Sequence, residues 1–360
     1  MNRARSVFLS QCRSYSTRNP TFQAGDRVLL RSCNDPSKTH FTRPLTPDLE
    51  LHVKSGTIKL GKLIGEPVRS TIASTKGTRF RASHPTFEEY VVNVARLVTP
   101  IYPHDAAAIA SLLSIHRGIR VLEAGTGHGS FTCSLLARGA DVTTVDQRED
   151  VSQKAQANIA GYRNGLLLEQ GKVDFRVGKI ADVIQEVGEN EFDVVFLDLP
   201  DPETYFRDAA KALKADGIVA IWCPSVSQIM KAVKMIEEEN LPLTMDKTIE
   251  FPGGSGSGAG LRRWTIRNAV IRASVKGRGV SVREQEGAVE LGEGLEDARV
   301  EMVCRPSVGE MIVGGGFLGM FRRRLDTETS KENIILSAEK RKFDRNGVWI
   351  DLNYVTPNNP

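Results

Sequence analysis

Apolar residues downstream of residue 105 recur in short runs that alternate with longer amphipathic segments. The runs are rich in Val, Ile and Leu, which predicts buried strands, and the segments between them predict helices. The predicted strands are 119–123, 141–146, 172–178, 192–198 and 217–224, and the predicted helices are 129–139, 150–162, 202–214 and 225–240. This alternation predicts a doubly wound, mainly parallel α/β sheet, which binds ligands at the carboxyl ends of its strands.

The rest of the chain has a different pattern. Residues 21–95 contain short alternating stretches separated by Gly, Asn, Asp and Pro, which predict a small β-rich domain of barrel or sandwich type. Within the α/β domain, 96–325, the Gly- and Ser-rich segment 253–260 and the Gly- and charge-rich segment 276–298 predict flexible insertions. The runs 262–275 and 311–324 predict a pair of strands that close the sheet. The polar tail, 326–360, supports no fold prediction.

The first 20 residues are rich in Arg and Ser and contain no acidic residue. This composition is typical of a mitochondrial transit peptide and predicts a location in the mitochondrial matrix; an ordinary N-terminal extension is the alternative. Removal of the segment would take four arginines from a chain of net charge +4. A nucleic-acid surface would then be a local patch and not a global excess of positive charge.

Two further classes of protein are disfavoured by composition. No apolar run approaches the roughly 18 residues that a membrane-spanning helix needs, so we expect no membrane partner. The five cysteines are scattered and include no paired spacing, which predicts neither a disulfide framework nor a zinc site.

A glycine-rich loop, "VLEAGTGHGSF" (121–131), follows the first predicted strand and begins a helix. Glycines allow the backbone to turn sharply and to approach a ligand closely, and a helix N-terminus offers free N–H donors. The candidate ligand-binding residues of this loop are Gly125, Gly127, Gly129 and Ser130. A loop of this kind binds either a nicotinamide dinucleotide or S-adenosylmethionine, and a glycine turn with no ligand is the structural alternative.

Two carboxylates bear on the choice of cofactor. Asp146 ends the second strand, where it would bind ribose hydroxyls of either cofactor. Glu123 lies two residues before the first glycine of the loop. An acid there would repel a pyrophosphate and attract a sulfonium cofactor that also carries an ammonium group. The pattern therefore favours S-adenosylmethionine.

The third strand and the last helix add weaker candidates. "GKIAD" (178–182), which contains Lys179 and Asp182, is expected to form a wall of the adenine pocket. Asp182 would accept a hydrogen bond from the adenine amino group, or it would cap the following helix. Gln228 is either an exposed helical residue or one that holds the cofactor pocket.

"FLDLPDP" (196–202) ends the fourth predicted strand with a carboxylate, Asp198, followed by two prolines that stop the strand. A carboxylate at the carboxyl end of a strand lies at the edge where such sheets bind ligands, so Asp198 is a candidate for chemistry. Asp201 is a better candidate for capping the next helix.

These motifs resemble, in order and separation, those of the tRNA adenine-N1 methyltransferases that modify adenosine 58 of the T-loop. The resemblance covers roughly residues 22–325. It rests on "RLVTPIYPHDAAAI" (96–109), "VLEAGTGHGSFT" (121–132), "FLDLPDP" (196–202) and "PSVSQIMKAV" (224–233). The N-terminal β-rich unit is similar to the small barrel of that family.

The resemblance implies a class I (Rossmann-like) methyltransferase that acts on tRNA, with Asp198 as the catalytic aspartate and Tyr102 near the target base. The implied reaction, methylation of adenine N1, requires alignment of N1 with the sulfonium methyl group. Asp198 would accept a hydrogen bond from the exocyclic amino group, and so stabilise the developing charge or act as a general base. An interface tyrosine is the alternative for Tyr102. The family forms tetramers, so a homo-oligomer, or a hetero-oligomer with a non-catalytic paralogue, is expected. Two departures from its motifs are Gly314-Gly315 in place of His-Thr and His104 in place of Lys.

Two other functions stay open from the sequence alone. One is a non-catalytic tRNA-binding subunit, and the other is a methyltransferase for a different RNA adenosine or a protein. RNA binding would rest on phosphate contacts from basic side chains. The candidate donors are Arg262, Arg263, Arg305, Arg322, Arg323, Arg324, Lys340, Arg341 and Lys342.

Overall fold

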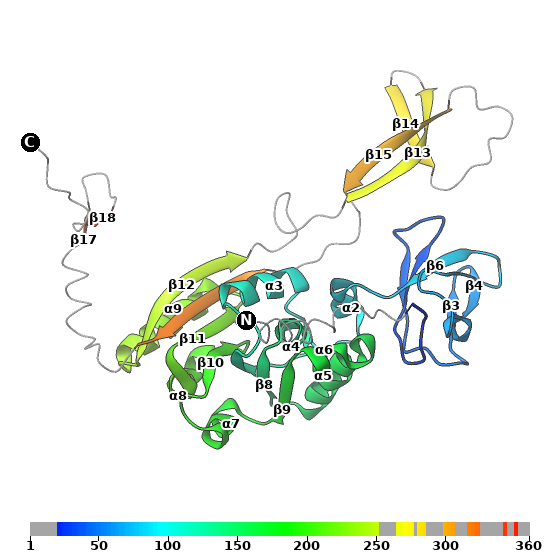
Figure 1. Ribbon diagram of the computed structural model, residues 1–360. Coiled ribbons are helices and arrows are strands. Elements are labelled where there is room, and N and C mark those ends of the chain that lie inside the picture. Colours follow the sequence, from blue (N-terminus) through cyan, green and yellow to red (C-terminus); the bar gives the residue numbers. More distant parts are fainter. Residues whose placement is uncertain are drawn as a thin grey trace, which may run out of the picture.

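The computed structural model describes residues 20–251, 264–276, 279–285, 298–306, 315–324, 341–343 and 349–351 (Figure 1). Three predicted segments lie wholly or mostly outside these residues: the leader, the 253–260 insertion and the polar tail. Over the described ranges, no helix has the length and apolar character that a membrane crossing requires.

A seven-stranded sheet forms the centre of the molecule, in the order β12-β16-β11-β10-β7-β8-β9. The strands β9, β8, β7, β10 and β11 are mutually parallel, and β16 runs antiparallel between β11 and β12. The α/β prediction is therefore confirmed. The strands are β7 (Arg120–Ala124), β8 (Asp141–Asp146), β9 (Lys172–Val177), β10 (Phe192–Leu197), β11 (Leu213–Cys223), β12 (Leu243–Phe251) and β16 (Gly316–Arg323).

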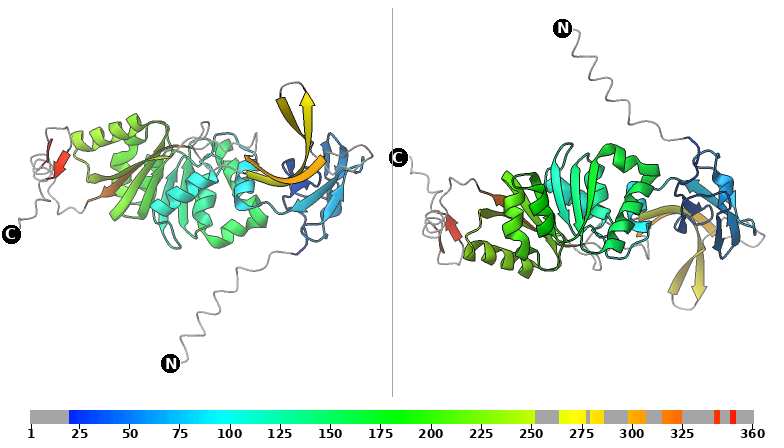
Figure 2. Two further views of the ribbon diagram at one scale, coloured as in Figure 1. Left: turned by 90° about the horizontal axis from the view of Figure 1, so that it is seen from above. Right: turned by 90° about the horizontal axis from the view of Figure 1, so that it is seen from below.

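Helices cover both faces of this sheet (Figures 1 and 2). Successive residues of a strand point to opposite faces, so Val121 packs into one apolar cluster and Leu122 into the other. Both faces need apolar residues, which is why the strands read as continuous apolar runs. The helices are α3 (Pro103–Leu112), α4 (Ser130–Leu136), α5 (Glu149–Gly161), α6 (Leu166–Gln170), α7 (Ile180–Val187), α8 (Phe206–Ala212) and α9 (Val226–Glu238).

The N-terminal domain is β-rich, as predicted, with a four-stranded sheet in the order β2-β1-β6-β5 and a β3-β4 hairpin around its own apolar core. It lies at one end of the molecule, beside α2 (Phe87–Asn93) and far from β12 (Figures 1 and 2). Its strands are β1 (Leu29–Ser32), β2 (Thr39–Phe41), β3 (Glu50–Val53), β4 (Gly56–Lys59), β5 (Thr71–Ala73) and β6 (Arg79–Ser83).

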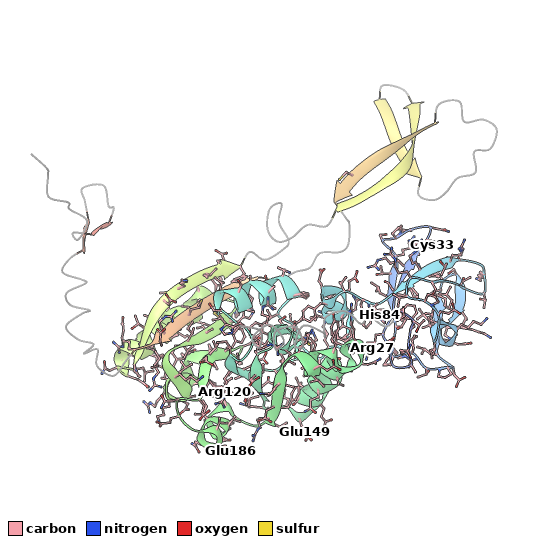
Figure 3. The ribbon with its side chains drawn as sticks, in the orientation of Figure 1. Arg27, Cys33, His84, Arg120, Glu149 and Glu186 are labelled. Atoms are coloured by element: carbon pink, nitrogen blue, oxygen red, sulfur yellow. The ribbon has the colours of Figure 1, made fainter. Side chains whose placement is uncertain are left out.

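Polar contacts join this domain to the α/β domain. Asn164 Nδ2 donates to Asp26 Oδ1 at 3.0 Å, and the Tyr90 hydroxyl donates to the backbone carbonyl of Asn158 in α5 at 2.6 Å. Arg27 and His84 lie on the side of the N-terminal domain that faces the α/β domain (Figure 3). The attachment therefore reaches α5, which packs beside the glycine loop.

Two predictions about the C-terminal half were wrong, and one strand was missed. The run 262–275 does not close the central sheet: β13 (Trp264–Lys276) pairs instead with β14 (Gly279–Gln285) and β15 (Ala298–Pro306) in a separate sheet. The segment 276–298 is not wholly irregular, because β14 forms within it. The edge strand β12 was not predicted, because most of its residues are exposed and leave no apolar run. Two further short strands, β17 (Arg341–Phe343) and β18 (Trp349–Asp351), pair with each other.

Candidate active site

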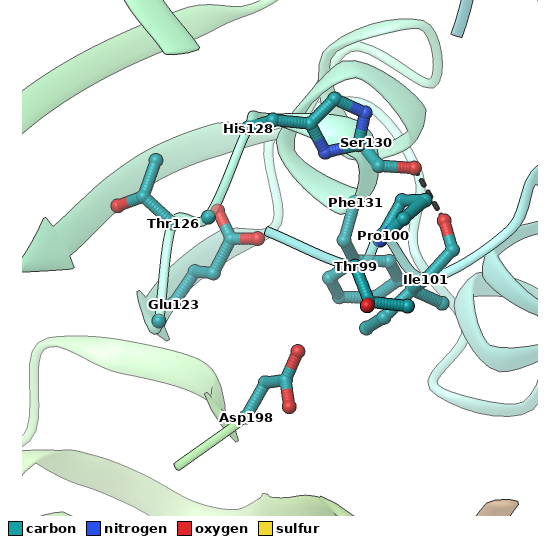
Figure 4. A pocket seen from close by; sticks show the side chains of 11 residues that line it. Thr99, Pro100, Ile101, Glu123, Thr126, His128, Ser130, Phe131 and Asp198 are labelled. Atoms are coloured by element: carbon teal, nitrogen blue, oxygen red, sulfur yellow. Dashed lines mark hydrogen bonds between the residues drawn. The ribbon is translucent and has the colours of Figure 1, made fainter. Parts of the chain in front are cut away.

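Two adjoining pockets lie at the carboxyl ends of β7, β8 and β10, and both include Gly125 and Asp198 in their walls. The smaller one contains Glu123 and residues of the glycine loop, and it is closed by the segment from Thr99 to Ile101 (Figure 4). The larger one, of about 490 Å³, contains Asp146 and the turn after β10. Its volume is within the range of small-ligand sites. The sheet therefore has its cavity where the topology predicts one.

Gly125 brings the end of β7 against the end of β10. Its φ is +92°, and a Cβ at this position would lie 2.3 Å from the backbone oxygen of Asp198. Hydrogen bonds fix this approach: Gly125 N donates to Val145 O at 2.8 Å, and Asp198 N donates to Ala124 O at 2.9 Å. Only glycine fits the space, so this position sets the distance between the loop and Asp198.

The other two loop glycines have different partners. Gly129 has a φ of +87° and directly precedes α4, and a Cβ there would approach Ala155 and Ile159 of α5 at 3.3 Å. Gly127 N donates to Asp146 Oδ2 at 3.2 Å. The loop is thus packed on α5 and hydrogen-bonded to the end of β8.

Glu123 is fully buried at the base of the smaller pocket. Its Oε2 accepts hydrogen bonds from the hydroxyls of Thr132, at 2.6 Å, and Thr144, at 2.8 Å. Burial raises the pKa of Glu123 to about 7, against the opposing effect of these two hydrogen bonds. The two threonines, which sequence reasoning missed, fix the carboxyl group in one orientation.

Asp198 follows β10 and projects toward the same space as Glu123 (Figure 4). Burial raises its pKa to about 7. Within the described part of the chain, neither carboxyl group forms an ion pair. A cation placed between them would remove the cost of ionising both. The pair of carboxyl groups and the close backbone approach at Gly125 fit S-adenosylmethionine, which carries a sulfonium and an ammonium group.

Asp146 ends β8 and lines the larger pocket, as predicted. Its carboxylate accepts hydrogen bonds from the Arg148 backbone N at 3.0 Å and from the Arg148 guanidinium at 3.1 and 3.2 Å. Arg148 also lines the pocket and was not among the predicted site residues. The pattern gave no signal for it, because a long exposed side chain two residues after a strand has many possible partners.

Backbone oxygens of the turn after β10 accept hydrogen bonds from neighbouring side chains. Gln228 lies in the first turn of α9, and its Nε2 donates to Pro200 O at 2.7 Å. It therefore holds the pocket wall and is not an isolated exposed residue. Asp201 precedes the short helix η4 (Pro202–Tyr205), but its carboxylate makes no capping hydrogen bond. The predicted capping by that side chain is wrong, since Thr204 bonds instead to the Asp201 carbonyl oxygen.

Ser130 and Tyr102 both adjoin Ile101, but only one of them lines a pocket. Ser130 lines the smaller pocket, and its hydroxyl donates to Ile101 O. Tyr102 directly precedes α3 and lines neither pocket; its ring is nearly parallel to that of His104, with centroids 6.5 Å apart. Asp105 binds both His104 Nε2 and Gly315 N at 3.0 Å, so it anchors the start of β16 beside α3.

The remaining candidates are not in the two pockets. The side chains of Lys179 and Asp182, at the start of α7, are exposed and line neither cavity, although Gly178 and Ile180 line the larger one. Their predicted contacts with adenine stay predictions. His128 is a pocket residue that the pattern did not single out; burial lowers the pKa of its imidazole.

One candidate group of phosphate donors lies far from the pockets. Arg322, Arg323 and Arg324 end the antiparallel strand β16, which places them at the amino ends of the parallel strands. Their guanidinium groups contact protein atoms there, including Asp216 and Asp246 for Arg322. The other candidates are not placed: Arg262, Arg263 and Lys340 lie outside the described residues, and only the backbone is described for Arg305, Arg341 and Lys342.

Comparison with known proteins gives consistent results. A profile of the family described as "tRNA methyltransferase complex GCD14 subunit" matches residues 82–250. A tRNA (adenine(58)-N(1))-methyltransferase, TrmI, from Thermus thermophilus is 30% identical over 220 residues, which cover 60% of this chain and 79% of that protein. The catalytic subunit TRM61 of the corresponding enzyme from Cryptococcus neoformans is 29% identical over 222 residues, 60% of this chain and 49% of that protein.

Solved structures show the same fold. The tRNA (m1A58) methyltransferase TrmI from Aquifex aeolicus has a TM-score of 0.59 and 25% sequence identity, and the match covers 85% of this chain and all of that one. A SAM-dependent O-methyltransferase from Thermotoga maritima has a TM-score of 0.60 at 22% identity, covering 86% of this chain and 97% of that one.

Proposed function

This chain belongs to the tRNA (adenine-58 N1) methyltransferase family, and we propose that it methylates N1 of adenosine 58 in the T-loop of mitochondrial tRNA. It is an S-adenosylmethionine-dependent enzyme of the class I fold. The observation that carries the proposal is the position of Asp198. This carboxyl group lies at the junction of the two pockets, directly against the glycine loop.

Different residues of the chain bind different parts of the cofactor. S-adenosylmethionine supplies an electrophilic methyl group on a sulfonium that leaves as a neutral thioether. Glu123, held by Thr132 and Thr144, provides negative charge at the base of the smaller pocket. Asp146, at the end of β8, offers acceptors for ribose hydroxyls in the larger one. The loop between them fixes their separation.

Asp198 is the residue that acts on the target adenine. Its carboxylate accepts a hydrogen bond from the exocyclic amino group of adenine, which increases electron density at N1. With S-adenosylmethionine bound, N1 would accept its methyl group in exchange for the thioether leaving group, and the base would become cationic. The carboxylate stabilises that charge and accepts a proton if one is released. Gln228, through Pro200, and the prolines after Asp198 hold it in place.

A non-catalytic subunit is disfavoured by the same geometry. A subunit that only holds RNA has no need of a buried and a half-buried carboxyl group that lack ionic partners in the described part of the chain, since their raised pKa makes folding less favourable at neutral pH. Their retention beside an intact glycine loop supports catalysis by this chain. Gly315, one of the two residues in place of the family His-Thr pair, donates its backbone N–H to Asp105.

Location and assembly are further parts of the proposal. The acid-free, Arg- and Ser-rich segment 1–20 supports import into mitochondria. We also propose that the enzyme assembles as a homo-oligomer, since the chain carries a complete site of its own. Imaging of a reporter fused to residues 1–20 tests the first statement, and the solution mass of the purified enzyme, alone and with candidate paralogues, tests the second.

Reverse-transcription mapping tests the target. N1 methylation blocks base pairing, so cDNA synthesis on mitochondrial tRNA should stop one nucleotide 3′ of adenosine 58. Loss of the enzyme should abolish these stops, and re-expression of the wild type, but not of Asp198→Asn, should restore them. A tRNA with guanosine at position 58 should accept no methyl group from the purified enzyme. Unchanged stops at position 58, with stops lost elsewhere, would assign a different RNA target.

A further inference from the structure

Asn158 is a buried amide in the last turn of α5, only 3% exposed. Its Nδ2 donates two hydrogen bonds, to the backbone oxygens of Ala95 and His128, each at 3.1 Å. Both partners are carbonyl oxygens, so only the amino end of the side chain fits between them. Each of its two N–H groups thus has an acceptor, and neither is left for another role.

The two carbonyls belong to two chain segments that both contribute residues to the smaller pocket. His128 lies in the glycine loop. Ala95 begins a segment, residues 95–101, that we call the pocket strap because Thr99, Pro100 and Ile101 also line the cavity. One side chain outside the cavity therefore links both segments.

Other contacts show how the strap lies on the loop. Its far end is bound by the Ser130 hydroxyl, which donates to Ile101 O. In between, Val98 packs over Gly127, where a Cβ would lie 3.2 Å from Val98 Cγ2. The strap is thus attached to the loop region at both ends, by Asn158 near its start and by Ser130 near its finish.

We propose that Asn158 is a positioning residue of the cofactor site, which holds the pocket strap against the glycine loop before the cofactor binds. The inference rests on the proposed function only in taking S-adenosylmethionine as the ligand. Without the amide, the buried carbonyl of His128 and the partly buried carbonyl of Ala95 lose this donor, and the strap is free to move away. Part of the binding free energy is then used to close the strap, so the dissociation constant rises while the chemical step is preserved.

Asn158→Ala and Asn158→Asp test this role by titration calorimetry with S-adenosylmethionine and by steady-state kinetics. We expect Kd and KM for the cofactor to rise about 10- to 100-fold. At saturating cofactor, kcat should stay within about threefold, because Asp198 and Glu123 are untouched. This division between KM and kcat is not expected from a general loss of stability.

Tyr90→Phe is the matched control. The Tyr90 hydroxyl donates to the backbone oxygen of the same Asn158, so its removal breaks a buried hydrogen bond at this residue but leaves the amide in place. This variant should lose stability comparably and bind the cofactor within about threefold of wild type. Equal changes in Kd for Tyr90→Phe and Asn158→Ala, or no change for Asn158→Ala, would overturn the proposal.

If Asn158→Ala does not fold, Asn158→Ser and hydrogen exchange provide the test. Without cofactor, residues 95–101 should exchange slowly in the wild type and faster in Asn158→Ser, and saturating cofactor should restore their protection in the variant. Equal exchange of residues 95–101 in the two free proteins would remove the positioning role. The two proposals also fail differently: wild type that does not bind S-adenosylmethionine contradicts the proposed function, whereas equal binding by wild type and Asn158→Ala contradicts only the role of Asn158.

Discussion

The two ends of the central sheet differ in whether their charged side chains form ion pairs. At the amino ends of the strands, charged side chains are paired: Asp193 with Lys214 at 2.8 Å, Arg120 with Glu191, and Arg322 with Asp216 and Asp246. At the carboxyl ends, Asp146 pairs with Arg148, but Glu123, which is buried, and Asp198, which is half-buried, form no ion pair within the described ranges. Both ends belong to the same strands, so the difference is not one of fold.

Exposed ion pairs such as those at the amino ends contribute little to stability. Buried carboxyl groups without a cation disfavour folding at neutral pH, which is the physical meaning of their raised pKa. A protein retains such groups where a ligand supplies the missing charge. The comparison therefore identifies the carboxyl-end carboxyl groups as functional and the amino-end ones as structural.

The largest expected effect is on catalysis, and it distinguishes Asp198, directly after β10, from Asp193 near the start of that strand. Asp198→Asn should lower kcat for methyl transfer by about 10²- to 10⁴-fold, because the amide is a poor acceptor and no base. The variant should still bind S-adenosylmethionine with a Kd within about tenfold of wild type, and it should be at least as stable at pH 8, since a buried carboxylate has been removed.

Asp193→Asn is the counterpart at the other end of β10. It weakens the contacts with Lys214 and with the Arg120 backbone N, so unfolding free energy should fall by about 1 kcal/mol while kcat stays within about threefold. Methyl-transfer assays and chemical denaturation measure both quantities. Impaired catalysis in Asp193→Asn, or retained catalysis in Asp198→Asn, would contradict the assignment of Asp198 as functional and Asp193 as structural.

The glycines that flank β7 give the second test. Gly118→Ala and Gly125→Ala both place alanine at a positive φ, of +86° and +92°, which costs about 1–2 kcal/mol. No atom lies near a Cβ at Gly118, whereas one at Gly125 would collide with the Asp198 backbone oxygen at 2.3 Å. We expect Gly125→Ala to lose an additional 1–3 kcal/mol, by analogy with overpacking, and to bind S-adenosylmethionine at least about tenfold more weakly. Similar losses in both variants would show that the close approach has no function.

The third test uses pH. Glu123 and Asp198 have pKa values raised to about 7, so both are largely neutral below pH 6 and charged above pH 8. Because the folded pKa lies above the unfolded one, their contribution to the stability of the free protein is lost as pH rises from about 4 through 7. Binding of a cationic cofactor should follow the opposite trend, and the affinity for S-adenosylmethionine should increase about tenfold from pH 6 to pH 8.

S-adenosylhomocysteine provides the control for charge, since it has the ammonium group but lacks the sulfonium. Its affinity should change less over the same range, and Asp198→Asn should make the two ligands respond alike. Calorimetric titrations at several pH values measure these differences. An affinity for S-adenosylmethionine that is constant from pH 6 to pH 8 would mean that neither carboxyl group responds to the sulfonium.

The sequence made the carboxyl-end residues predictable because parallel strands end at the same edge. A strand that is buried on both faces appears in the sequence as a continuous apolar run. The ends of these runs alone therefore predicted that Glu123, Asp146 and Asp198 lie at the same edge of the sheet. Partners chosen by three-dimensional packing could not be predicted. Asn158 is one polar position of an amphipathic helix, Arg148 reaches back to Asp146, and β13 pairs outside the central sheet although its apolar pattern suits either sheet.

The smallest expected effect concerns Arg322, a candidate phosphate donor at the amino end. Its guanidinium is bound to Asp216 and Asp246, so Arg322→Ala should lower the unfolding free energy by at most about 1 kcal/mol. The affinity for tRNA should change less than about twofold, with no change in its dependence on salt. A lost phosphate contact would instead reduce the slope of log K against log salt by about 1. Binding assays over a range of salt concentrations distinguish the two. A reduced slope would extend the RNA-binding surface to the amino ends, where charge pairing would then serve recognition as well as stability.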